Sequence, residues 1–305
     1  MDEAIIIGGG PSALSAALYL GRFERKTTLI CDSFGGQAAI AGELENYPGF
    51  LNISGAQLVA KMVEQVKNLP SIKIITAEHA TSVSKESEGF TVKTNKGEYK
   101  AKTLLISTGR SPRKLGLNGE NELIGKGLSY CAVCDGPFAR NKEVIIIGGG
   151  YAATEAALIL EKLASKIVIL NIGDKLSGET VVIHKVMQNK KIEVVSNAQT
   201  TDFILSEGKI AGIKYKDTKA GESKEVKGEF VFVEIGQVPN SKEFEGIVEI
   251  NKEGEIVADL TTKMTSVAGI FASGDIASQS TKQVIAAAGD GAKAAISINS
   301  FLQNN

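Results

Sequence analysis

A chain of 305 residues, of which 43% are hydrophobic and 23% charged, has the composition of a folded globular protein with two or three domains. Its formal net charge of -1 excludes the basic bias typical of proteins that bind nucleic acids or anionic membranes. Three cysteines are too few for a secreted disulfide scaffold, and no apolar run approaches the roughly 18 residues of a spanning helix, so we expect a cytoplasmic protein.

The chain opens with the pattern of a βαβ unit. An apolar strand at residues 3–7 runs into three glycines, after which Ala and Leu recur at helical spacing. A second apolar strand follows at 27–31, and a connection of this kind makes the two strands parallel. The same order returns from Glu143, with its own three glycines and a second strand at 166–170. The repeat predicts two related α/β domains of the Rossmann type, each with three layers.

The elements downstream extend both copies of the repeat. Further strands are expected at residues 90–94, 103–108, 208–215 and 230–236. Pro, Gly and Asn interrupt the periodic pattern at 113–119 and 237–244, which we interpret as linkers. An Ala-rich helix from Gln283 ends the sequence, and we expect this tail to rejoin the first domain.

The first glycine loop has the spacing of a dinucleotide-binding turn. Gly8 and Gly10 let backbone amides approach a pyrophosphate, and the small side chain of Ala13 permits close helix–strand packing. Asp32 lies near the distance expected of an acid that binds the adenosine ribose, although the neighbouring Ser33 could take that role. The loop predicts a bound dinucleotide.

The second glycine loop repeats this skeleton with Gly148, Gly150 and Ala153, but its surroundings differ. Tyr151 places a bulky side chain where a backbone should approach phosphate. A nicotinamide nucleotide also needs an acid or basic residues after the second strand, and the segment 171–175 reads Asn-Ile-Gly-Asp-Lys, with no arginine. A working nucleotide site and a vestigial one both remain open from the sequence.

Cys131 and Cys134 form a Cys-x-x-Cys motif followed by Asp135. Two cysteines with this spacing can close a small disulfide at the start of a helix and cycle between dithiol and disulfide. Asp135 could pass protons as a general acid, or could be a plain acidic residue at a helix N-terminus.

A zinc site is the alternative use of these cysteines, and it needs further ligands. The chain offers only Cys31, His79 and His184, none in a second close pair. We interpret Cys31 as a small buried apolar residue and assign neither histidine a role.

Together these residues resemble the low-molecular-weight flavin thioredoxin reductases, over essentially the whole chain. The resemblance lies in the order and spacing of Gly8-Gly-Gly-Pro-Ser, Gly35-Gly36-Gln37, Glu45-Asn-Tyr-Pro-Gly-Phe50, Ser107-Thr-Gly109, Cys131-Ala-Val-Cys-Asp-Gly-Pro-Phe138, Ile235-Gly-Gln-Val-Pro-Asn240, Gly274-Asp275 and Ala287-Ala-Gly-Asp-Gly291. It implies a homodimer whose FAD-binding domain is split between residues 1–115 and 242–305. The inserted NAD(P)-binding-like domain, 116–241, carries the dithiol.

The resemblance also implies how FAD is bound. Loop amides would take the phosphates, Asp275 a ribityl hydroxyl, and side-chain amides the polar edges of the flavin. The cofactor-binding residues expected in this way are Gly8, Gly10, Pro11, Ser12, Ala13, Asp32, Gly36, Gln37, Asn46, Thr108, Gly109, Gly274, Asp275, Gln283 and Val284.

By the same resemblance, Cys134 faces the flavin and Cys131 attacks the disulfide of thioredoxin, with Asp135 assisting proton transfer. Because one dithiol cannot reach a buried flavin and a protein substrate at once, the inserted domain must rotate on its linkers.

The sequence departs from the family pattern at the electron input. Members that use NADPH carry a His-Arg-Arg type cluster where this chain has Asn171-Ile172-Gly173. Arginine holds a 2′-phosphate through two parallel hydrogen bonds, so the departure predicts a donor other than NADPH, with ferredoxin favoured. The alternatives are an ordinary NADPH-dependent thioredoxin reductase and, in another class, a non-catalytic flavin- or zinc-binding interaction protein.

Overall fold

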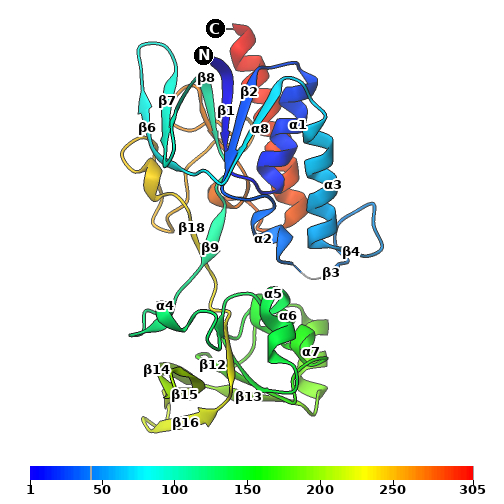
Figure 1. The fold of residues 1–305 in the computed structure, drawn as a ribbon, viewed down its shortest axis with the longest axis vertical. Coiled ribbons are helices and arrows are strands. Elements are labelled where there is room, and N and C mark those ends of the chain that lie inside the picture. Colours follow the sequence, from blue (N-terminus) through cyan, green and yellow to red (C-terminus); the bar gives the residue numbers. More distant parts are fainter. Residues whose placement is uncertain (42, 305) are drawn as a thin grey trace. The chain divides into compact units, whose positions relative to one another are not determined.

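The structure, a computed structural model, describes residues 1–41 and 43–304. Within them the chain forms two compact units (Figure 1). Unit 1 comprises Met1–Ser111 and the chain from Val238 onward, and unit 2 comprises Pro112–Gln237. The boundaries expected after residues 115 and 241 lie a few residues beyond those of the units.

Unit 1 is built on a mixed sheet with the strand order β5-β2-β1-β8-β7-β6, and β19 also pairs with β8. The sheet is parallel from β5 to β8 and along β19, whereas β7 and β6 continue it as an antiparallel meander. Its strands are β1 (Asp2–Ile7), β2 (Thr27–Cys31), β5 (Ile72–Thr76), β6 (Ala80–Lys85), β7 (Phe90–Thr94), β8 (Glu98–Ile106) and β19 (Ile270–Ala272).

Helices cover one face of this sheet, where α1, α3 and α8 lie side by side (Figure 1). Leu14, Leu20 and Phe271 belong to the core between these helices and the sheet, whereas Ile5 and Phe244 belong to the core on the opposite face. The helices and short elements of unit 1 are α1 (Pro11–Arg22), α2 (Gly36–Ala39), β3 (Glu43–Leu44), β4 (Ile53–Ser54), α3 (Gly55–Lys67), the 3-10 helices η2 (Lys242–Phe244) and η3 (Gly274–Ile276), and α8 (Val284–Asn304).

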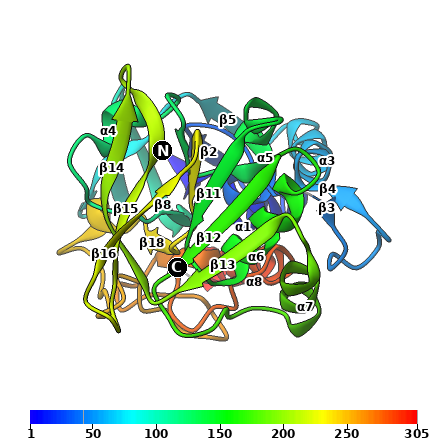
Figure 2. The same ribbon diagram turned by 90° about the horizontal axis from the view of Figure 1, so that it is seen from below.

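Unit 2 repeats the βαβ plan with a parallel sheet in the order β10-β17-β11-β12-β13, and Figure 2 shows β11, β12 and β13 side by side. Apart from the exposed Glu143 at the start of β11, the central strands β11 and β17 consist of buried apolar residues, as expected of a parallel sheet covered on both faces. These strands are β10 (Leu128–Ser129), β11 (Glu143–Ile147), β12 (Lys166–Asn171), β13 (Ile192–Ser196) and β17 (Phe230–Val233).

A separate antiparallel sheet, β14-β15-β16, contributes to the core on one face of the parallel sheet of unit 2. The helix α6 and its neighbours bury apolar side chains on the other face. The remaining elements of unit 2 are α4 (Glu120–Leu123), α5 (Ala132–Asp135), the 3-10 helix η1 (Gly136–Ala139), α6 (Tyr151–Leu160), α7 (Thr180–Gln188), β14 (Ala198–Ser206), β15 (Lys209–Asp217) and β16 (Ser223–Lys227). The expected pair of three-layer Rossmann-type folds is confirmed.

The two segments that connect the units pair with each other as β9 (Arg110–Pro112) and β18 (Gln237–Pro239). They lie close to the stretches that the sequence marks as linkers. Over residues 1–41 and 43–304, no helix combines the length and the apolar character needed to cross a bilayer.

Candidate functional site

The first glycine loop connects the carboxyl end of β1 to α1. Gly8 has a φ of +129°, and a Cβ there would lie 2.2 Å from the carbonyl oxygen of Ser107, so the turn requires glycine. Gly10 stands at the N-cap position with open space around it, and α1 begins at Pro11 without a side-chain cap or an acid in its first turn. The helix N-terminus therefore offers backbone amides to an anion.

Three buried serines, Ser12, Ser107 and Ser273, form hydrogen bonds with one another next to this loop. The hydroxyl of Ser12 lies 2.6 Å from that of Ser273 and 3.3 Å from that of Ser107, and Ser107 and Ser273 are 2.8 Å apart. Gly274 packs so closely here that a Cβ would lie 2.8 Å from Cβ of Ser12. Ser12 was expected to bind cofactor, but its side chain joins α1 to the ends of β8 and β19, which leaves its backbone amide for a ligand.

The carboxylate of Asp32 is exposed just beyond β2, as a ribose-binding acid requires. Its Oδ1 lies 3.1 Å from Nδ1 of His79, a residue without an expected role. Cys31, directly before it, is buried, and burial together with the Asp32 charge raises the pKa of its thiol to about 11. The interpretation of Cys31 as a small buried residue is confirmed.

Polar side chains of the 36–46 segment reach two other parts of unit 1. The side-chain amide of Gln37 donates to the carbonyl oxygen of Arg110 over 3.4 Å, and that of Asn46 donates to Oε1 of Gln283 over 3.3 Å. Gly36 has a φ of +49°, and a Cβ there would lie 3.9 Å from Cα of Gly10. Two groups of the expected residues are thus brought together, Gly10 with Gly36 and Gln37, and Asn46 with Gln283.

Thr108 and Gly109 follow β8, and part of their hydrogen-bonding capacity is used within the protein. The Thr108 hydroxyl donates to the carbonyl oxygen of Asn240 over 2.8 Å, and the Asn240 side chain donates to the carbonyl of Thr108 over 2.9 Å. The backbone amide of Asn240 donates to Gly109. Asn240, which the resemblance includes only as part of a motif, therefore fixes the start of β9.

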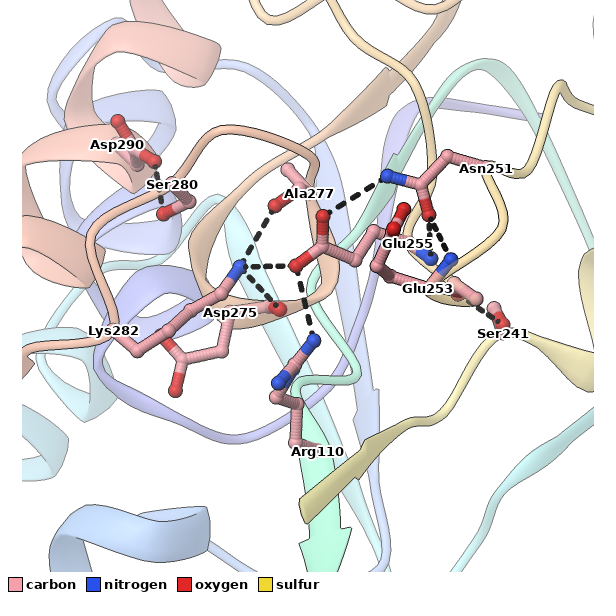
Figure 3. Close-up of polar contacts among 11 residues, drawn as sticks. Arg110, Ser241, Asn251, Glu253, Glu255, Asp275, Ala277, Ser280, Lys282 and Asp290 are labelled. Carbon is pink, nitrogen blue, oxygen red and sulfur yellow. Dashed lines mark hydrogen bonds and ion pairs between the residues drawn. The ribbon is translucent and has the colours of Figure 1, made fainter. Parts of the chain in front are cut away.

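Asp275 lies in η3, at the carboxyl end of β19 (Figure 3). Burial raises the pKa of its carboxyl, and the positive charges of Lys282 and Arg110 oppose that rise. Its Oδ1 is buried and has no hydrogen-bond partner among the described residues. An unpaired buried carboxylate oxygen is costly unless a ligand supplies a donor. Together with the uncapped start of α1 and the exposed Asp32, it makes unit 1 fit FAD.

The dithiol lies in unit 2, where β10 leads into α5. Cys131 and Cys134 form a disulfide with their Cα atoms 5.4 Å apart. Cys131 is the N-cap of α5, and its Sγ accepts a hydrogen bond from the backbone N–H of Cys134 over 3.0 Å. The same N–H is therefore in place to stabilise negative charge on Cys131 when the bond is opened.

Buried Ser129 connects this pair to the neighbouring acid. Its hydroxyl donates to Oδ2 of Asp135 over 2.6 Å and accepts from the backbone N–H of Cys131 over 3.0 Å. Asp135 in turn donates its backbone N–H to the carbonyl of Cys131. Sequence reasoning missed Ser129, although a serine two residues before a loop N–H is a known turn-forming pattern.

Buried Glu120 holds the residue that precedes the pair. Its carboxylate accepts the hydroxyl of Tyr130 and the backbone N–H groups of Leu115 and Gly116, the latter two over 2.8 Å. Burial and the Glu120 carboxylate raise the pKa of Tyr130. The dithiol segment is thereby fastened to the chain that enters unit 2.

The side chain of Asn171 packs against the second glycine loop and forms hydrogen bonds with the residues that follow it. Asn171 is buried, and its Oδ1 lies 2.2 Å from where a Cβ of Gly149 would be. Its side chain also accepts from the N–H of Gly173 and donates to the carbonyls of Gly173 and Lys175. Gly150 caps α6 as Gly10 caps α1. The N-terminus of α6 can therefore still bind an anion. The Asn171 side chain, however, stabilises the loop from within and is not directed to a phosphate group.

The surroundings of this loop carry exposed apolar side chains. Tyr151 is 54% exposed and Ile172 is 64% exposed. Asp174 is paired with Lys219 over 2.5 Å. Of these residues, only Ile172 lies in the segment 171–173, where the resemblance leads us to expect a basic cluster in a protein that uses NADPH.

Across residues 1–41 and 43–304, no group of three or more His, Cys, Asp and Glu side chains could hold a metal ion. The zinc alternative therefore has no ligand set in the described part of the chain.

Comparisons with known proteins agree with this geometry. The family described as pyridine nucleotide-disulphide oxidoreductase matches residues 2–291. Thioredoxin reductase of Bacillus subtilis (strain 168) is 38% identical over 306 residues, covering 99% of this chain and 95% of that protein. Thioredoxin reductase of Treponema pallidum is 38% identical over 305 residues, covering 98% and 97%. The crystal structure of Lactococcus lactis thioredoxin reductase has a TM-score of 0.95 at 33% identity and covers 100% of both chains.

Proposed function

Because the chain belongs to the pyridine nucleotide-disulphide oxidoreductase family and, within it, to the low-molecular-weight thioredoxin reductases, we propose that it reduces thioredoxin through FAD and the Cys131–Cys134 disulfide. The observation that carries this proposal is the disulfide itself, which closes beside an acid oriented by a buried serine. Neither a flavin-binding nor a zinc-binding interaction protein would need that arrangement.

In this proposal unit 1 holds FAD through the amides of the first glycine loop, Asp32 and Asp275. FAD supplies, when bound, the two-electron step between the donor and the disulfide. Gln37, Asn46 and Gln283 orient the polar edges of the flavin, and Ser107 and Ser273 keep the loop in shape through Ser12.

Two electrons and two protons open the Cys131–Cys134 disulfide to two thiols, and Asp135 is placed to transfer a proton. The Cys131 thiolate, which accepts the N–H of Cys134, then attacks one sulfur of the thioredoxin disulfide and forms a mixed disulfide. Cys134 attacks Sγ of Cys131, so the protein disulfide closes again and reduced thioredoxin leaves. One dithiol must both accept electrons from the flavin and reduce thioredoxin, so this proposal requires unit 2 to rotate on β9 and β18. We also expect the protein to be a homodimer.

The proposed electron donor differs from the one expected from the sequence, which was ferredoxin. The comparisons give no support to a ferredoxin-dependent variant, and the family description favours the alternative, a reduced pyridine nucleotide, with NADPH as the ordinary choice. Ferredoxin stays as a second candidate on one observation. The loop after β12 uses Asn171 internally and exposes Ile172 in place of a phosphate clamp.

Anaerobic mixing of the purified yellow protein with NADPH, NADH or reduced ferredoxin, followed by a thioredoxin assay, tests both parts. We expect flavin bleaching by a nucleotide and loss of thioredoxin reduction in Cys131→Ser and Cys134→Ser, with Cys31→Ala as the matched control. Bleaching by ferredoxin alone would reverse the order of the donors. A protein that reduces no thioredoxin with any donor, or whose Cys131→Ser variant is fully active, would overturn the proposed function.

A further inference from the structure

The carboxylate of Glu255 binds both cations nearest to Asp275 (Figure 3). Its Oε1 lies 3.0 Å from Nη2 of Arg110 and 3.0 Å from Nζ of Lys282, and its Oε2 accepts the side-chain amide of Asn251 over 3.1 Å. Burial by itself would raise the pKa of Glu255, but Lys282, Asn251 and Arg110 outweigh it and the pKa is lowered. Glu255 is therefore a largely buried, ionised acceptor for two positive groups.

Asp275 lies beside the same cations without an ion pair from its own carboxylate among the described residues. Lys282 instead donates to the backbone carbonyls of Asp275 and Ala277, over 3.1 and 3.0 Å. Nε of Arg110 is buried and has no hydrogen-bond partner in the described part of the chain, as is the case for Oδ1 of Asp275. Yet both charges act on Asp275, because they oppose the rise in its pKa.

A carboxylate near two cations can form charge-assisted hydrogen bonds with them, and a second carboxylate within reach competes for the same donors. Glu255 is that competitor in unit 1. It is 13% exposed, and it accepts from a guanidinium that starts β9 and an ammonium that directly precedes Gln283.

We propose that Glu255 is a positioning residue that holds Arg110 and Lys282 away from the Asp275 carboxylate, and so keeps that carboxylate free to accept a cofactor hydroxyl. The proposal rests on the proposed function, since the hydroxyl belongs to FAD. Glu255 itself touches no cofactor atom in this scheme. Removing its charge frees Arg110 to pair with Asp275, and the ligand must then break that pair to bind.

The test measures FAD affinity of the full-length apoprotein by quenching of flavin fluorescence. We expect Glu255→Gln to raise the Kd for FAD about 10- to 100-fold, the range for a hydrogen bond to a charged group. Adding Arg110→Met to Glu255→Gln should restore the Kd to within about threefold of the unsubstituted protein. The competing guanidinium is then gone, and Lys282 is still held by the backbone carbonyls of Asp275 and Ala277. Glu253→Gln, at an exposed glutamate two positions earlier, is the matched control.

An unchanged Kd in Glu255→Gln would overturn the proposal. So would a double variant that binds FAD as weakly as Glu255→Gln, because Glu255 would then act through general structure. Asp275→Asn should raise the Kd for FAD whether or not Glu255 acts in this way. A raised Kd in Asp275→Asn with an unchanged Kd in Glu255→Gln would show that the role of Glu255 is wrong while Asp275 still binds the cofactor. If the unsubstituted apoprotein binds no FAD, the proposed function fails, and this inference fails with it.

Discussion

Lys263 and Asp290 form an ion pair in the interior of unit 1, with 2.7 Å between Nζ and Oδ1. Their side chains are only 4% and 14% exposed. The hydroxyl of Ser280 donates to the other carboxylate oxygen over 3.0 Å. The pair thus fastens α8 to the loop that precedes β19 and to the segment between η3 and α8, where the expected flavin-binding residues lie.

Replacing Lys263 with methionine should destabilise unit 1 strongly, because it leaves the Asp290 carboxylate buried without its counter-ion. We expect the free energy of opening unit 1 to fall by about 3–5 kcal/mol. Hydrogen–deuterium exchange of peptides from α8 and β19 measures this locally, which matters in a chain of two units.

Two variants give that measurement its controls. Lys100→Met breaks the exposed pair with Glu98 in the same unit and should cost less than about 1 kcal/mol. Lys263→Met combined with Asp290→Leu should recover much of the loss, since no unpaired charge is left buried. Equal exchange in Lys263→Met and Lys100→Met would contradict the prediction.

Glu234 gives unit 2 a pH dependence in the neutral range. Burial, with the nearby charge of Glu155, raises the pKa of its carboxyl from 4.5 to about 7. Below pH 4.5 the group is protonated in both folded and unfolded states and costs nothing. As pH rises from 4.5 through 7, the unfolded state ionises first, so folding loses up to about 3 kcal/mol by pH 8.

Glu234→Gln should therefore stabilise unit 2 at pH 8 by most of that amount and have little effect near pH 4.5. Exchange of β17 and β11 peptides as a function of pH measures the difference, and Glu229→Gln, at an exposed position in the same segment, serves as the control. A Glu234→Gln variant whose stability follows the same pH curve as the unsubstituted protein would sink this assignment.

The features that could be predicted from the sequence are those that depend on residues close together in the chain. Apolar strands that run into Gly8 and Gly148 predict the βαβ units because strand, turn and helix each leave a local pattern. The spacing of Cys131 and Cys134 likewise predicts a pair able to close a disulfide. Such patterns depend on distances along the chain, which the printed sequence contains.

The parts that escaped prediction join residues far apart in the sequence. Ser12 meets Ser273, and Arg110 meets Glu255, only because the fold brings β1, β8 and β19 together at one edge of a sheet. No local pattern distinguishes these serines or this glutamate from exposed ones. At the second glycine loop, the sequence revealed the missing arginines but not that Asn171 would brace the loop.

Ser129→Ala should slow thioredoxin reduction about tenfold, because Asp135 loses the donor that fixes its carboxylate and Cys131 loses a backbone partner. Reduction of the flavin by the donor involves neither contact and should keep its rate. Rapid kinetics that follow flavin bleaching and thioredoxin reduction separately measure the two steps. Ser129→Thr keeps the hydroxyl and should restore most of the rate, whereas slowing of both steps together would point to general disruption.

Two arginines placed after β12 should make the protein prefer NADPH to NADH. The natural segment 171–173 has no basic side chain that could bind the 2′-phosphate of NADPH. Ile172 is already 64% exposed, and a Cβ at Gly173 would lie at ordinary contact distances, 3.6–3.8 Å, from Asn171 and Lys175. Ile172→Arg with Gly173→Arg therefore adds two guanidinium groups without disturbing the hydrogen bonds of Asn171.

We expect the double variant to bind NADPH at least about tenfold more tightly relative to NADH than the unsubstituted protein does, through bidentate arginine–phosphate contacts. Calorimetric titration with each nucleotide measures this preference independently of turnover. Ile172→Gln with Gly173→Gln matches the length of the new side chains without their charge and should leave the preference unchanged. If the arginine pair shifts it no more than the glutamine pair, the segment 171–173 does not lie against the 2′-phosphate, and the second glycine loop holds no nucleotide in the family's manner.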